Sequence, residues 1–203
     1  MKKRVLLIVA AALVIGSVGY YSMKKEQNYE NFGVATTSAS FEHHESVDEL
    51  ADEAELIVLG SFTGKRENFV AKDGKGDYIS TISKSVVKID KVIKGDKKKN
   101  STIEVFEDCY LTDNQRYIAT EGYKWMNEDG KYLLFLTPGT SDNTYVIVGI
   151  YEGKFDLTRK DRAKEHKDLK KAFLDPDVEF LGEDFELEHF YKLKGEALKK
   201  YNL

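Results

Sequence analysis

The clearest alternation of apolar and polar positions lies in residues 78–95, YISTISKSVVKIDKVIKG. Val87 and Ile89 fall on one face of an extended chain and Lys88 on the other, which is the period of two of a half-buried strand. The alternation then slips by one residue, because Val92 falls on the face of Lys88. Such a slip indicates a β-bulge, which bends and twists a strand. We therefore predict one long, bent strand of the kind that a small closed barrel requires; the alternative is a strand followed by an irregular apolar turn.

Shorter apolar runs on both sides of this segment predict the strands that pair with it. Gly60 in the first run predicts a bend or a close approach of two backbones. The run YLLFLT is apolar almost throughout, which is typical of a strand buried on both faces, here between a barrel and a covering helix. The predicted partner strands are residues 56–64, 102–107, 132–137, 145–151 and 155–157. These strands make the domain mainly β, with helices added at its ends.

The polar segment between the first two strands, residues 65–77, is predicted to be a flexible loop. It contains the sequence Gly74-Lys75-Gly76, and glycines beside a lysine occur in loops that bind phosphate. The Walker spacing is absent, and no Ser or Thr follows the lysine. We therefore interpret the segment as the loop of a hairpin.

Two helices are predicted beside the strands. Residues 46–55 begin with a capping box, in which the Ser46 side chain accepts from a backbone amide and Glu49 reaches back. Residues 185–201 carry apolar side chains at helical spacing, which predicts an amphipathic helix. We expect this helix to pack on the barrel; the alternative is a helix that binds a partner or lies on a membrane. Together, residues 158–203 form the predicted C-terminal helical segment.

The N-terminal residues 1–23 are predicted to be a signal-anchor or a signal peptide. Residues 5–23 carry no charge and are about as long as a bilayer-spanning helix, for which roughly 20 residues suffice. More basic residues precede this run than follow it, which favours a cytoplasmic N-terminus and an exported body. A cleaved signal peptide and a buried core helix are the alternatives. Both signal interpretations place the body outside the cytoplasm. In the signal-anchor interpretation a polar linker, residues 24–45, joins the body to the membrane.

Charge and cysteine content narrow the classes of partner and compartment. The net charge is −4, so the overall charge of the chain does not favour a nucleic-acid partner, which would call for a basic face. The chain has one cysteine, Cys109, and therefore forms no disulfide within itself. A domain outside the cell that lacks disulfides must rely on its core, which fits the outer face of a Gram-positive bacterium better than a eukaryotic secretory route.

No motif in the sequence predicts an enzyme, a metal site or a cofactor. The sequence Glu42-His43-His44-Glu45 offers metal-binding groups, but a zinc site needs three or four converging ligands and no motif surrounds His166 or His189. We therefore interpret this stretch as a solvated segment before a helix. Neither a nucleophile elbow nor a zinc-protease helix motif is present, and a lone cysteine is more often structural than catalytic.

Three segments together resemble a known family of barrels. They are LIVLG at residues 56–60, VVKIDKVIKGD at residues 86–96 and GKYLLFL at residues 130–136. This series is similar to the netrin-module and tissue-inhibitor-of-metalloproteinase type of OB barrel, and to small exported bacterial domains of uncharacterised role. The resemblance implies a five-stranded OB-like barrel over residues 46–157. Those inhibitors insert a disulfide-tied N-terminal cysteine into a protease, a mechanism that this chain lacks because Cys109 has no partner.

These features favour a membrane-anchored, non-catalytic binding module on the outer face of the cell. Its partner is predicted to be an unknown protein or a cell-wall polymer. The alternatives are a structural or stress-related envelope protein and a hydrolase. Residues 109–129 would cover the open end of the barrel. The candidate binding residues are the aromatic side chains of this segment, Tyr110, Tyr117, Tyr123 and Trp125. The loop 65–77 is a second candidate.

Overall fold

The computed structural model describes residues 32–159, 168–182 and 184–203. Its larger sheet contains β2 (Leu56–Lys72), β3 (Tyr78–Lys94), β4 (Thr102–Glu107), β7 (Tyr132–Pro138), β8 (Thr144–Ile147) and β9 (Lys154–Asp156). The strand order is β2-β3-β4-β8-β7-β9, and β2 also pairs with β7. Following the pairing from β2 through β3, β4, β8 and β7 therefore leads back to β2. Only β4 and β8 run parallel; the other neighbours are antiparallel. The fold is thus mainly β, as predicted.

The long strand and its bulge are confirmed. Gly60 of β2 pairs with Ile89, whereas Leu59 pairs with Lys91, so the register skips Asp90. The backbones are close at this point, because a Cβ atom on Gly60 would lie 2.7 Å from a methyl carbon of Val87. Glycine is therefore required where β2 crosses the bulge.

Two segments with no predicted strand form a second sheet. β1 (Gly33–Thr37) runs parallel to β6 (Arg116–Thr120), which pairs antiparallel with β5 (Cys109–Leu111). The segment predicted to be a polar linker, residues 24–45, contains β1, and the segment 109–129 holds the other two strands. Pairing with residues some 80 positions away supplies the backbone hydrogen bonds of β1, and no local period reports such a partner.

Two predicted boundaries were also wrong. β2 continues to Lys72, so most of the expected loop 65–77 is strand, because its backbone stays paired with β3. β8 ends at Ile147 rather than at residue 151. Gly149 and Ile150 take positive φ angles there, which ends a strand and begins a turn.

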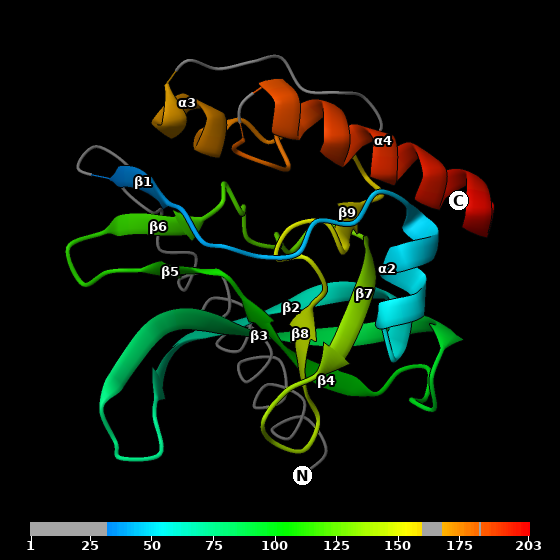
Figure 1. Cartoon of the computed structure of the whole chain (residues 1–203), viewed down its shortest axis with the longest axis horizontal. Helices are drawn as coiled ribbons and strands as arrows, with labels where there is room; N and C mark the ends of the chain where they lie inside the picture. The colour runs from blue at the N-terminus through cyan, green and yellow to red at the C-terminus, as the bar shows by residue number, and fades with distance from the viewer. Residues whose placement is uncertain (1–31, 160–167, 183) are drawn as a thin grey trace, which may run out of the picture. The chain divides into compact units, whose positions relative to one another are not determined.

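The predicted helices are confirmed, with small changes at their ends. Ser46 caps α2 (Val47–Glu53) and accepts a hydrogen bond from the Glu49 amide. α3 (Leu169–Leu174) ends at Asp175. α4 (Asp184–Tyr201) buries one side, which comprises Leu187, Phe190, Leu193 and Ala197. Figure 1 shows α3 and α4 along one side of residues 33–203, with the β2–β3 hairpin extending on the other side.

The chain divides into two units, residues 1–32 and residues 33–203, and the strands and helices named above all belong to the second unit. The predicted membrane segment, residues 5–23, lies outside the described residues. In the part of the chain that is described, no helix combines the length and the apolar character that crossing a membrane requires.

Candidate binding surface

The β2–β3 hairpin extends beyond the strands that flank it. We call its outer part, residues 69–82, the hairpin arm. Within the described residues, the strands of the arm pair only with each other, from Phe69 with Ile82 to Lys72 with Tyr78. A turn joins them, in which the Asp73 carboxylate accepts hydrogen bonds from two backbone amides. The arm is therefore an extended ribbon closed by a short turn, and it presents both faces outside the ring of strands.

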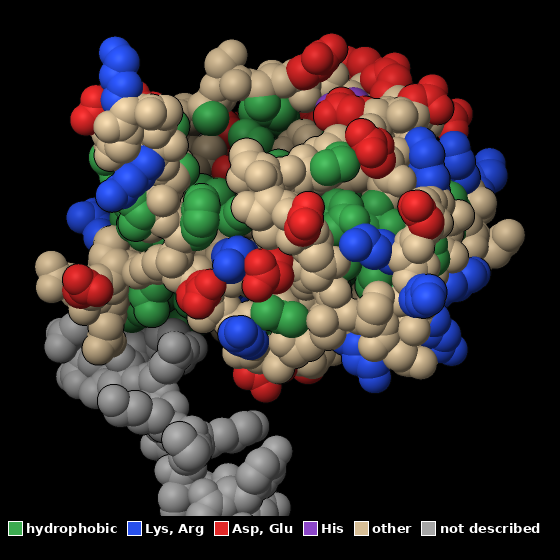
Figure 2. All heavy atoms as spheres, turned by 90° about the horizontal axis from the view of Figure 1, so that it is seen from below, with side chains coloured by type: hydrophobic (Ala, Val, Ile, Leu, Met, Phe, Trp, Pro, Cys, Tyr) green, Lys and Arg blue, Asp and Glu red, His purple; other side chains and the backbone are tan. Residues whose placement is uncertain are grey.

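The arm exposes large apolar side chains. The exposed fractions are 48% for Val70, 64% for Tyr78 and 59% for Ile79. Figure 2 shows one face of the molecule, on which hydrophobic side chains lie between separate acidic and basic groups. Exposed apolar side chains gathered on one projecting element are typical of an interaction surface.

The outer face of β3 and β4 continues from the arm. The Phe69 and Phe106 rings lie 5.0 Å apart and connect the arm to β4. Beside them, the Lys84 ammonium lies 3.1 Å from Glu67 and 3.2 Å from Glu104. Between residues 83 and 89, the inner face of β3 is fully buried. Its Ser83, Ser85, Val87 and Ile89 are 0% exposed. One side of this strand therefore faces the core and the other is available to a ligand.

A buried carboxylate fixes the root of the arm. Glu107 is fully buried, and its Oε1 accepts hydrogen bonds from Arg66 Nη2 at 2.7 Å and from Nε at 3.0 Å. Its Oε2 accepts from the Tyr123 hydroxyl and from the Met126 amide, each at 2.8 Å. Burial alone would raise the pKa of Glu107, but the charges of Arg66 and Lys154 outweigh it and lower the pKa. Glu107 therefore stays ionised and anchors the hairpin to the core.

The four predicted binding residues fall into two groups. Tyr117 and Tyr123 are 0% exposed, and the Tyr117 hydroxyl donates to the Tyr123 carbonyl. Tyr110 and Trp125 are partly exposed. The Trp125 ring lies 4.7 Å from the Arg66 guanidinium carbon and 4.8 Å from the Tyr117 ring. The structure thus brings Tyr117, Tyr123 and Trp125 together beside Arg66, and of the four predicted residues only Tyr110 and Trp125 reach the surface.

Cys109 lies inside this region. It is 1% exposed, and burial together with the negative charge of Glu107 raises the pKa of its thiol. Since the thiolate is the nucleophilic form, this environment favours an inert, structural cysteine. His166 lies outside the described residues.

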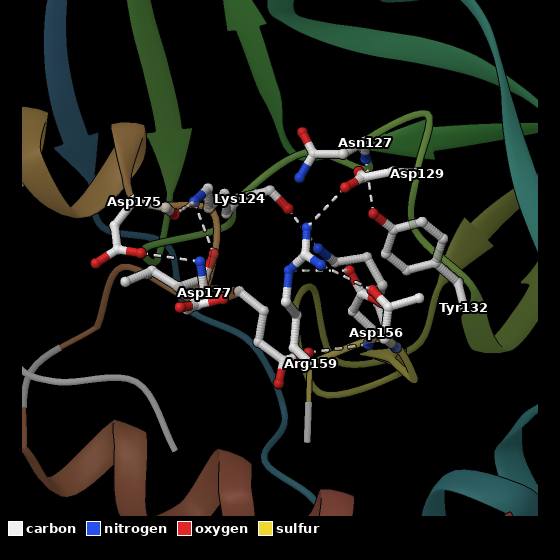
Figure 3. Close-up of polar contacts among 12 residues, drawn as sticks. Lys124, Asn127, Asp129, Tyr132, Asp156, Arg159, Asp175 and Asp177 are labelled. Atoms are coloured by element: carbon white, nitrogen blue, oxygen red, sulfur yellow. Dashed lines mark hydrogen bonds and ion pairs between the residues drawn. The ribbon is translucent and has the colours of Figure 1, made fainter. Parts of the chain in front are cut away.

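A second polar cluster fixes the segments around α3 (Figure 3). The Lys124 ammonium donates to the backbone carbonyls of Asp175 and Val178, each at 2.7 Å. Burial and the charge of Lys154 lower the pKa of Lys124 to about 8. Arg159 reaches the Asp129 carboxylate at 3.2 Å. The Lys124 contacts therefore join the end of α3 to the segment after β6, and the Arg159–Asp129 pair joins the segment after β9 to the turn before β7.

Sequence reasoning missed a third cluster, which forms around Glu152. His43 and His44, predicted to be solvated, both contact its buried carboxylate, and His189 reaches it from α4. The other nitrogen of His44 lies 2.7 Å from Glu53. Burial lowers the pKa of His44, but the hydrogen bonds to the two glutamates outweigh it and raise the pKa. The adjacent histidines between carboxylates were the sequence signal, and the missing ligands come from distant segments.

No protein-family model matches the chain, and a search of the curated proteins found no match.

Proposed function

We propose that the chain is a non-catalytic binding module whose hairpin arm contacts a partner on the outer face of the cell. The exposure of Val70, Tyr78 and Ile79 on the arm carries this proposal. A monomeric protein gains nothing in stability from such exposure, whereas a partner that covers these side chains removes apolar area from water. The locked root of the arm supports it too, because a rigid element loses less entropy on binding.

The proposal includes an OB-like barrel formed by residues 46–157. The order β2-β3-β4-β8-β7 with closure onto β2, and the parallel pair β4–β8, support it. OB barrels bind ligands on the face of their second and third strands and through the loops that join strands 1 to 2 and 4 to 5. The corresponding parts here are β3, β4, the hairpin arm and residues 139–143. The similarity to the netrin-module and tissue-inhibitor type of barrel belongs to the same proposal.

The proposed location is the outer surface of the cell membrane, with residues 5–23 as an uncleaved anchor. The alternative is release after cleavage of this segment. The partner is a protein or a cell-wall polymer, and the apolar character of the arm favours a protein. Tyr110 and Trp125 extend the proposed surface at the root of the arm.

The test is crosslinking in intact cells, followed by capture of the full-length chain through a C-terminal tag. In the arm variant, Val70→Thr, Tyr78→Thr and Ile79→Thr are combined, since threonine keeps the strand propensity and removes apolar area. The control is Leu174→Ala, which alters a side chain that is 42% exposed at the end of α3. We expect one reproducible partner that the arm variant loses and the control retains.

Two results would overturn the arm as the binding element: equal recovery of the partner by both variants, or no partner together with no binding to isolated cell wall. Binding to isolated cell wall that the arm variant loses would instead identify a polymer as the partner. Thermal unfolding of the two variants shows whether each is folded, so that a loss of capture reports on the surface.

A further inference from the structure

Three metal-binding atoms from distant parts of the chain converge beside α4. His43 Nδ1, Glu152 Oε1 and His189 Nε2 all lie within 4.8 Å of one another. His43 Nδ1 is 2.9 Å from Glu152 Oε1, and His189 Nε2 is 3.2 Å from the same oxygen. Ligands bound at about 2.0–2.1 Å in a tetrahedron lie roughly 3.3 Å apart, so these separations are close to those around a zinc ion.

Two of these three atoms already share a hydrogen bond, since His43 Nδ1 lies 2.9 Å from Glu152 Oε1, and other contacts hold the groups around them. Glu152 Oε2 accepts a hydrogen bond from the His44 amide and contacts His44 Nδ1, so the carboxylate is held with Oε1 directed at the other two histidines. His189 Nε2 is buried and makes no hydrogen bond, despite its short distance from Glu152. A buried nitrogen without a hydrogen bond is costly, and a cation between it and the carboxylate would satisfy both.

The backbone around Glu152 leaves room for this arrangement. Gly149 has a φ angle of +63°, and a Cβ atom there would lie 2.6 Å from Glu152 Oε2 and 3.1 Å from His44 Nδ1. The turn between β8 and β9 therefore needs glycine to hold the carboxylate in place. The His43 and His189 rings are nearly perpendicular, at 86°, with centroids 6.2 Å apart, so the two imidazoles meet at their edges rather than stacking.

The charges around Glu152 also favour a cation. Among the described residues, the ion pairs of Glu152 are with histidines alone, so no lysine or arginine neutralises it. All three described histidines belong to this cluster, and Figure 2 shows histidine at the surface beside acidic side chains. The His43 side chain is 56% exposed, which gives an ion access from solvent.

We infer that His43, Glu152 and His189 bind a divalent transition-metal ion, with zinc as the preferred occupant. Two imidazole nitrogens and one carboxylate suit zinc and disfavour calcium and magnesium, which take oxygen ligands. His44 does not bind the ion itself; it contacts the other oxygen of the Glu152 carboxylate and thereby fixes the orientation of this ligand. Water completes the coordination on the exposed side of His43. The ion joins the segment before α2, the turn after β8, and α4.

The test is zinc binding to the full-length chain, purified in detergent and first stripped of metal with a chelator. Affinity is measured by competition with a chromophoric chelator, and Co²⁺ replaces zinc for visible absorption spectra that report tetrahedral coordination. We expect one ion per chain. His189→Ala and Glu152→Gln should each weaken binding at least about 10-fold and abolish the Co²⁺ spectrum.

His43→Ala is the variant least able to disturb folding, because that side chain is largely exposed, and it should weaken binding to a similar degree. The matched control is Glu188→Gln, which neutralises an exposed carboxylate beside His189 on α4 and should leave the affinity unchanged. A wild-type dissociation constant weaker than about 100 μM, or wild-type affinity in both His43→Ala and His189→Ala, would overturn the inference. The hairpin arm contributes nothing to this site, so either result leaves the proposed function standing.

Discussion

Glu107 and Glu152 are both completely buried carboxylates, yet their surroundings differ in kind. Arg66, whose charge is permanent, binds Glu107 through two nitrogens, and hydroxyl and amide donors complete its hydrogen bonds. Glu152 faces histidines, which carry a charge only when protonated. A buried carboxylate with a permanent cation is part of the scaffold, whereas one with conditional cations can respond to protons or metal ions.

The largest effect should come from removing the permanent cation. Arg66→Met leaves Glu107 buried without its charge partner, and breaking such a pair typically costs about 3–5 kcal/mol of unfolding free energy. Urea denaturation measures this loss. The control is Lys84→Met, which breaks two exposed ion pairs and should cost less than about 1 kcal/mol. If the two variants lose equal stability, Glu107 is not an anchor of the hairpin.

A smaller effect should come from displacing Glu152. Gly149→Ala adds a Cβ atom 2.6 Å from the carboxylate at a positive φ angle, so we expect a loss of about 1–2 kcal/mol in metal-free protein. Gly195→Ala in α4 is the matched control, because nothing lies within 4 Å of its added atom; it should stabilise the chain by about 0.5–1 kcal/mol. Equal effects of the two substitutions in thermal unfolding would contradict a tightly held Glu152.

The smallest effect should appear in the dependence of stability on pH. Burial and the neighbouring charge of Glu107 raise the pKa of Asp108 from 3.8 to about 6. Between these values the folded chain binds more protons than the unfolded chain, so this group makes stability fall as pH rises from about 4 to 6. Asp108→Asn should remove that fall. We expect the fall to be about 1 kcal/mol of unfolding free energy, because Asp108 is only partly buried and solvent screens its charge.

Denaturation of Asp108→Asn at several pH values measures this effect. An unchanged pH profile would mean that burial and the charge of Glu107 do not raise the pKa of Asp108. A flatter profile would confirm the raised pKa, as expected for a carboxyl group that is buried beside the charge of Glu107.

The fold was predictable wherever neighbouring residues carry the signal. Alternation located β3, and the slip after Ile89 located its bulge at Asp90. The capping residue Ser46 located the start of α2. The candidate site was less predictable, because aromatic content does not report burial. Tyr117 and Tyr123 were expected to contact a ligand, and both lie in the interior.

The sequence by itself determined the mainly β class, the long bent strand and the helices, since side-chain periods of two and 3.6 residues express local geometry. Only the tertiary structure decided that β1 pairs with β6, that the hairpin extends to Lys72, and that His43, Glu152 and His189 meet. Those outcomes depend on contacts between residues far apart in the chain. His43 and Glu152 are 109 positions apart, and no pattern of neighbouring residues records such a distance.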